Sequence, residues 1–201
     1  MRVQLRPISA LISWIKAAFE KPAPPAPVMQ VALRRAVADD FQFIYELSVE
    51  QARKGHFNVD HSNPGELAGL ALQLSSAIDD VPVRMPPPRN GAGACVWVLT
   101  VDLKPVGFAM FLEDRPNSWD RKVELFMVAL REDFQGHGLG KLLVTQLLPG
   151  VQSKLIYARC HAPSTRMKAL LEAHGFKTVN VSKSGMTTLE LRPDLRRGIQ
   201  A

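Results

Sequence analysis

The chain has 201 residues, of which 46% are apolar and 22% charged. This suits one domain with a full-sized core and a short extension. No apolar run is long enough to span a bilayer, and the two cysteines, Cys95 and Cys160, lack metal-ligand spacing. We therefore expect a soluble, cytoplasmic protein with free thiols. The net charge of +6 permits nucleic-acid binding, but Lys and Arg are too scattered to indicate it.

The segment 1–29 differs from the rest of the chain. Apolar residues at helical spacing predict a short amphipathic helix: Ile8, Leu11, Ile12, Ile15 and Phe19. A proline-rich spacer follows at 21–27. Lys16 interrupts the apolar stretch and no small-x-small cleavage site follows it, which argues against a signal peptide. We expect the helix to pack on its own domain, or to dock a dimer mate, another partner or a membrane surface.

Strand and helix patterns fill residues 30–192 without an internal repeat, and residues 193–201 form a tail. The predicted strands are Val31–Arg35, Cys95–Val101, Pro105–Leu112, Val123–Leu130, Leu155–Cys160, Gly175–Asn180 and Met186–Leu191. The first predicted helix follows a cap at residues 38–40, and the others are Gly65–Ile78, Gly138–Leu148 and Thr165–Ala173. The segment Val81–Gly93 is predicted to be a loop. This order predicts one mixed α/β domain.

A glycine-rich turn separates the strand Val123–Leu130 from the helix that follows it. Its glycines are Gly136, Gly138 and Gly140. At such a turn several backbone N–H groups converge, and the positive end of the helix dipole points to the same place. Glycines also leave out the Cβ atoms that would hold a phosphate away from the backbone. The turn therefore predicts a phosphorylated ligand.

The spacing of the turn decides between kinds of phosphate loop. A nucleotide P-loop requires Ser or Thr after the lysine, but Leu142 follows Lys141. The dinucleotide fingerprint Gly-x-Gly-x-x-Gly does not fit either, because Gly140 comes one residue before the position of its last glycine. The pattern that fits is Gln/Arg-x-x-Gly-x-Gly, with Gln135, Gly138 and Gly140. It resembles the pyrophosphate loop with which the GNAT family of N-acetyltransferases binds acetyl-CoA.

The resemblance covers about residues 31–192. Three further sequence segments resemble segments of the family and occur in the expected order. They are residues 33–41 at the first strand, 105–109 in the third strand and 169–176 near the end. The resemblance implies the GNAT fold, an α/β (α+β mixed) architecture. Its central, mostly antiparallel sheet is splayed between the fourth and fifth strands and flanked by helices.

The resemblance also implies acetyl-CoA as co-substrate and no metal. Backbone groups of Val128 and Leu130 would pair with the pantetheine arm, and N–H groups of the turn would hold the pyrophosphate. The residues expected at this cofactor site are Val128, Ala129, Leu130, Gln135, Gly136, His137, Gly138, Leu139, Gly140 and Lys141. Arg131 is a further basic residue that could assist.

Acetyl transfer to an amine requires a neutral amine, a polarised thioester carbonyl and a proton for the leaving thiolate. Glu124 is the candidate general base, because it lies eleven positions before Gln135, where histone-type family members carry their catalytic glutamate. It is also an acidic residue within an apolar strand. The alternative is a solvent-facing residue beside Arg121 and Lys122.

The leaving-group acid departs from the family pattern. Leu171 occupies the position where many members have a tyrosine, and leucine donates no proton. Ser164 stands where an asparagine often begins the helix, and we expect a catalytic role for it and for Tyr157. Cys160 and His161, near the end of the fifth predicted strand, are further possible substitutes.

The resemblance implies that the first helices, the loop between them and the closing hairpin bind the amine acceptor. The segment 54–63 is polar and aromatic, and we expect it to face the substrate; a metal site at His56, Asp60 and His61 is the alternative. The predicted function is direct acetyl transfer, in a ternary complex, to a primary amine of a small molecule, peptide or protein. The alternative is a non-catalytic acyl-CoA-binding sensor or partner-docking module, which Leu171 favours.

Overall fold

The computed structural model describes residues 29–83, 92–114, 122–151 and 154–193. The predicted amphipathic helix and the whole of the spacer after it lie outside these residues, as does the tail from 194 onward. No helix within the described ranges is long and apolar enough to cross a membrane.

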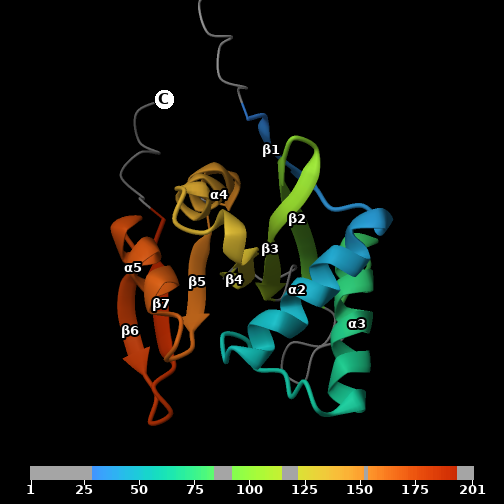
Figure 1. Ribbon diagram of the computed structural model, residues 1–201. Coiled ribbons are helices and arrows are strands. Elements are labelled where there is room, and N and C mark those ends of the chain that lie inside the picture. The colour runs from blue at the N-terminus through green and yellow to red at the C-terminus, as the bar shows by residue number, and fades with distance from the viewer. Residues whose placement is uncertain (1–28, 84–91, 115–121, 152–153, 194–201) are drawn as a thin grey trace, which may run out of the picture.

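Seven strands form one sheet in the order β1-β2-β3-β4-β5-β7-β6 (Figure 1). The strands are β1 (Val31–Arg35), β2 (Gly93–Val101), β3 (Lys104–Asp114), β4 (Lys122–Leu130), β5 (Leu155–Cys160), β6 (Lys177–Val181) and β7 (Thr187–Leu191). All neighbouring pairs are antiparallel except β4 and β5, which run parallel. The predicted fold class is confirmed.

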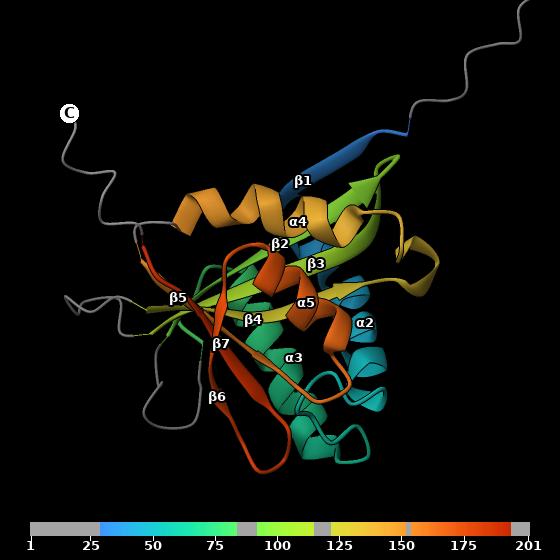
Figure 2. The same ribbon diagram turned by 90° about the vertical axis from the view of Figure 1, so that its left-hand side faces the viewer.

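Helices cover both faces of the sheet (Figure 2). The helices α2 (Phe41–Arg53) and α3 (Pro64–Ile78) pack on one face, and α4 (Leu139–Leu147) and α5 (Thr165–Ala173) pack on the other. Short 3-10 turns occupy Ala38–Asp40, Glu132–Phe134 and Leu148–Val151. Two apolar clusters result, one built around Ile44 and Leu74 and the other around Leu143 and Leu171. Each helix buries one apolar stripe.

Local chemistry fixes where elements begin and turn. Helix α3 starts at Pro64 because the side chain of Asn63 accepts a hydrogen bond from the Gly65 N–H at 2.9 Å. The turn between β2 and β3 places Asp102 and Leu103 at φ of +48° and +66°, the left-handed geometry of a tight hairpin. Helix α4 begins at Leu139, one residue later than predicted, because Gly138 is its N-cap.

The parallel pairing of β4 with β5 is short. It joins Lys122–Leu125 to Leu155–Ala158 and then stops, although β4 continues to Leu130. A register shift follows on the other side of β4, where Met110 pairs with Met127 but Phe111 pairs with Leu125. Phe126 is therefore the extra residue of a β-bulge, which bends the strand locally. The bend lies where β4 leaves β5, so a gap opens within the sheet.

Gly107 allows β3 and the end of β4 to lie close together. A Cβ atom at this position would collide with the side chain of Leu130 and lie 2.7 Å from the carbonyl oxygen of Ala129. Only glycine fits without a shift of the strand end. The glycine in the third-strand phrase 105–109 thus sets the position of the residues at the end of β4.

A partly buried ion pair ties β1 to the start of α2. The guanidinium of Arg34 donates to the two carboxylate oxygens of Asp40 at 2.6 and 2.8 Å, and the Val37 N–H donates to the same carboxylate at 2.9 Å. Asp40 is buried, whereas the side chain of Arg34 is 41% exposed. The hydrogen bond from Arg34 lowers the pKa of Asp40 below its ordinary value of 3.8.

We expect Asp40→Asn to lower the free energy of unfolding at pH 7 by roughly 1–2 kcal/mol, a value moderated by the exposure of Arg34. Because folding lowers the pKa of Asp40, this contribution is present above about pH 4. It disappears as the pH falls through the folded-state pKa. Urea denaturation of both proteins between pH 7 and pH 2.5 measures it. The exposed Asp39→Asn variant is the control, and a difference independent of pH would contradict the assignment.

Candidate functional site

The glycine turn has the backbone geometry of an anion site. Gly136 and Gly138 adopt φ of +82° and +79°, which L side chains rarely adopt. A Cβ atom at either position would meet nothing within 4 Å, so the space beside the turn is open. Glycine is required here for the conformation, since no neighbouring atom crowds the position. The open side of the turn leaves room for a ligand against the backbone.

Donors at the turn are available. Within the described residues, no acceptor takes a hydrogen bond from the backbone N–H groups of Gly136, His137 or Gly138. The first N–H groups of α4 lack acceptors inside the helix, as in any α-helix. The first intrahelical bond runs from the Leu142 N–H to the Gly138 carbonyl at 3.0 Å. The turn and the helix start therefore offer several N–H donors, which fit a pyrophosphate.

Side chains around the turn play different parts. The amide of Gln135 donates to the Leu130 carbonyl at 3.0 Å and thereby holds the turn against the end of β4. Arg131 lies over the ring of Phe134 and pairs with Asp133 at 2.7 Å, so its charge is already engaged. Lys141 contributes to the wall of the adjacent cavity. Lys141 is therefore the basic residue of this turn that borders the cavity, whereas Arg131 is not among the lining residues.

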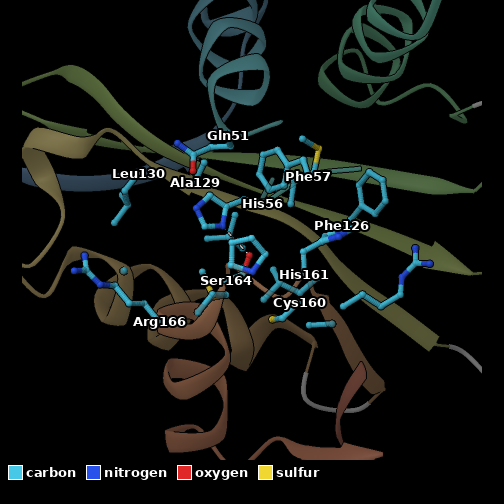
Figure 3. Close-up of a pocket in the computed structure, with 18 of the residues that line it drawn as sticks. Gln51, His56, Phe57, Phe126, Ala129, Leu130, Cys160, His161, Ser164 and Arg166 are labelled. Carbon is cyan, nitrogen blue, oxygen red and sulfur yellow. Dashed lines mark hydrogen bonds between the residues drawn. The ribbon is translucent and has the colours of Figure 1, made fainter. Parts of the chain in front are cut away.

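A cavity of about 1310 Å³ runs from this turn through the gap between β4 and β5 to the end of α2 (Figure 3). Its walls include most of the predicted cofactor and catalytic residues: Glu124, Val128, Ala129, Leu130, Gln135, Gly136, Gly138, Gly140, Lys141 and Ser164. His137 is exposed and outside the wall, and the side chain of Leu139 lies in the core. Tyr157 also lies outside the wall.

Glu124 is buried at the wall of the gap, with 1% of its surface exposed. Arg159 on β5 donates to its two carboxylate oxygens, from Nε at 2.8 Å and from NH2 at 3.4 Å. The hydroxyl of Tyr157 donates to the same carboxylate at 3.3 Å. The predicted catalytic residues Glu124 and Tyr157 therefore lie together, although Tyr157 contacts the carboxylate instead of the cavity.

Two residues far apart in the sequence meet across the cavity. Nδ1 of His56, in the loop after α2, lies 2.9 Å from the hydroxyl oxygen of Ser164, which precedes α5 (Figure 3). The neighbouring residues also lie close together, because a Cβ atom at Gly55 would be 3.4 Å from the side chain of Pro163. The pKa of His56 is lowered by burial and, less strongly, by the positive charge of Lys54 and by His161. The imidazole is therefore neutral at pH 7.

Gln51 is a functional candidate that sequence reasoning missed. Its side chain lines the cavity and is 6% exposed, and its amide nitrogen has no hydrogen-bond partner among the described residues. A buried unpaired amide is unfavourable by about 1–3 kcal/mol, so such groups commonly have a ligand or water partner. The sequence pattern did not indicate a functional role for Gln51, because this residue lies on the buried side of α2.

The metal alternative finds no support in the residues described. No group of three or more metal-ligating side chains occurs in that part of the chain. The carboxylate of Asp60 instead accepts hydrogen bonds from the backbone and hydroxyl of Ser62 at 2.9 and 2.6 Å. Of the predicted substrate-facing segment 54–63, the residues His56, Phe57, Asn58 and Val59 line the cavity.

Comparison with known proteins identifies the architecture. The model of the acetyltransferase (GNAT) family matches residues 45–176. The chain belongs to the GNAT family. No curated protein matches its sequence.

Solved GNAT structures share the fold at low identity. A phosphinothricin acetyltransferase from Sinorhizobium meliloti in complex with acetyl-CoA aligns with a TM-score of 0.61 at 22% identity, over 81% of this chain and 88% of that one. A spermidine N-acetyltransferase from Vibrio cholerae in complex with CoA and spermine gives a TM-score of 0.57 at 16% identity, over 80% and 93%. A putative acetyltransferase from Salmonella typhimurium with acetyl-CoA gives 0.59 at 18%, over 82% and 95%.

Cys160 is poorly suited to carry an acyl group in this GNAT protein. It is buried at the end of β5, and burial raises the pKa of its thiol to about 11. Because the thiolate is the nucleophile, almost none of the reactive form exists near neutral pH.

We expect iodoacetamide at pH 8 to leave Cys160 unmodified in the folded protein and to alkylate it once guanidinium unfolds the chain. Mass spectrometry of the peptide that contains Cys160 measures the extent of reaction. Equal alkylation rates in the folded and unfolded proteins would show that the thiol is reactive in place.

Proposed function

We propose that this protein is an acyl-CoA-dependent N-acyltransferase that transfers an acetyl group to a primary amine. The observation that carries the proposal is one continuous cavity that joins the N–H donors of the glycine turn to the gap between β4 and β5. A phosphorylated, elongated co-substrate fits such a cavity, with its diphosphate at the turn and its thioester in the gap. Acetyl-CoA supplies the activated acyl group as a thioester.

The backbone at the end of β4 supports this placement of the pantetheine arm. Residues Phe126–Leu130 have no pairing to β5, so their polar groups on that side face the cavity and not a neighbouring strand. Peptide groups in this position can form strand-like hydrogen bonds with the amides of pantetheine. The apolar side chains of Val128 and Leu130 pack against the core on the α4 side.

The acceptor end of the cavity has both apolar and polar side chains. Phe57, Val59, Leu70, Phe126 and Met127 line it together with Gln51, Asn58, Glu66 and Gln73. The acceptor in this proposal therefore has an apolar part beside its amine. The single cavity supports direct transfer in a ternary complex, because one continuous space can hold both substrates in line for attack.

Glu124 is proposed to take the proton that the ammonium form of the acceptor must lose before attack. Arg159 and Tyr157 hold its carboxylate at the cavity wall. The proposed role is that of a fixed base whose position is set by β5.

Calorimetry with acetyl-CoA tests the cofactor site. We expect the wild type to bind one equivalent and Gly138→Ala to bind about tenfold more weakly. The variant relaxes from a φ of +79°, and the return to this geometry is unfavourable by about 1–2 kcal/mol. Gly150→Ala is the matched control, since Gly150 has an ordinary φ and open space around it. A wild type that binds no acetyl-CoA would refute the proposal.

Turnover tests the proposed base. We expect Glu124→Gln to lower kcat at pH 7 by at least about 100-fold in a thiol-release assay over a panel of amines, with the Kd for acetyl-CoA unchanged. Glu113→Gln is the matched control, because Glu113 forms a similar ion pair with Lys154 at 2.8 Å outside the cavity. Equal turnover in Glu124→Gln and wild type would exclude Glu124 as base. A wild type that binds acetyl-CoA but acetylates no amine would favour the sensor alternative.

A further inference from the structure

The proposed reaction contains a second proton transfer that Glu124 does not cover. When a neutral amine attacks the thioester, a C–N bond forms, the nitrogen gains positive charge, and the C–S bond breaks to release a thiolate. One proton must therefore leave the nitrogen and one must reach the sulfur. Leu171 is buried beside the cavity and has no proton to donate. Another side chain at this wall can move the proton.

His56 and Ser164 are in the right place for this step. Both line the cavity, and their Nδ1 and Oγ atoms are 2.9 Å apart although the residues are separated by 108 positions in the sequence. The backbone N–H of His56 donates to the Gln51 carbonyl at 3.0 Å, which fixes the base of the side chain. No described residue forms a hydrogen bond with Nε2 of His56, so this nitrogen is left for a ligand.

The charges around His56 keep its ring neutral before the reaction. Lys54 at the end of α2 and His161 after β5 both face it, and both lower its pKa below 6.5, in addition to the larger effect of burial. Lys54 is itself paired with Glu50 at 2.7 Å and Glu132 at 3.0 Å, which moderates its charge. Glu124 and Arg159 line the same cavity and form their own ion pair.

We propose that His56 carries the proton from the attacking nitrogen to the departing sulfur, and that Ser164 orients its imidazole. This inference rests on the proposed function. With a proton on Nδ1, the ring donates to the Ser164 oxygen, and Nε2 is free to accept the proton from nitrogen. The same Nε2 then delivers the proton to the thiolate, so His56 ends each cycle neutral. No external acid or base is consumed in this step.

The two proton-handling groups have separate tasks. Glu124 removes the proton that the ammonium loses before attack, and His56 transfers the proton that bond formation releases. A thiol has an ordinary pKa near 8.5, well above that of His56, so the imidazolium is a competent donor to the thiolate. His56 thus replaces the tyrosine whose position Leu171 occupies.

Kinetics of His56→Gln test the proposal. We expect kcat to fall by at least about 100-fold, while the Kd for acetyl-CoA and the Tm remain close to wild type. In the wild type, kcat should decline as the pH falls through the pKa of His56, which lies below its ordinary value of 6.5, because the ring becomes protonated. This decline should be absent in the variant. Imidazole added to His56→Ala should restore part of the turnover.

Ser164 acts through His56, so its variants should behave differently. Ser164→Ala should reduce kcat by about tenfold and displace the acidic limb of the pH profile, and Ser164→Thr should recover most of the loss. The matched control is His174→Gln. His174 also lies 2.9 Å from a hydroxyl, that of Thr145, but outside the cavity, and turnover should be unaffected.

Two results would overturn the proposal. One is His56→Gln turnover equal to wild type; the other is a loss that imidazole does not restore in a folded His56→Ala protein that still binds acetyl-CoA. If His56→Gln does not fold, the variants Ser164→Ala, Ser164→Thr and His56→Asn decide the question by the same measurements of kcat, pH profile and acetyl-CoA binding. A wild type that neither binds acetyl-CoA nor acetylates any amine would refute the proposed function itself. Failure of the His56 proposal alone would leave both wild-type activities in place.

Discussion

The early end of the pairing between β4 and β5 is the feature on which the rest of the site depends. Four residues of each strand are paired, and β4 then continues alone as far as Leu130. An unpaired strand edge inside a sheet exposes peptide groups that must find partners. The bulge at Phe126 and the close approach of Gly107 to the end of β4 hold the strand in this divergent course. A cavity inside a sheet is the result.

Several polar groups at the cavity are held in place by neighbouring residues. Arg159 and Tyr157 hold Glu124, Ser164 contacts His56, and Gln135 ties the glycine turn to Leu130. A group fixed in this way loses little conformational entropy when a ligand binds. The side-chain amide nitrogen of Gln51, by contrast, is buried and has no hydrogen-bond partner among the described residues. It marks a part of the wall where a bound molecule can supply the missing hydrogen bond.

Long-range contacts explain why part of the site escaped sequence reasoning. The glycine turn and the strand before it are contiguous in the sequence, so their spacing was enough to predict the fold and the residues expected to bind the cofactor. His56 and Ser164 come from loops on opposite faces of the sheet, and no local pattern relates them. For Arg131 the sequence suggested a phosphate contact but could not show its surroundings, in which it pairs with Asp133 and lies over the ring of Phe134.

Periodicity and glycine spacing were sufficient for the order of strands and helices, the family resemblance and the location of the anion turn, because all three depend on residues close together in the chain. The ion pair of Glu124 with Arg159, the orientation of His56 by Ser164 and the burial of Gln51 depend on which strands and loops become neighbours. Those neighbours are set by packing of the two helix layers on the splayed sheet. The environment of a titratable group, and hence its chemistry, follows from that packing and not from its position in the sequence.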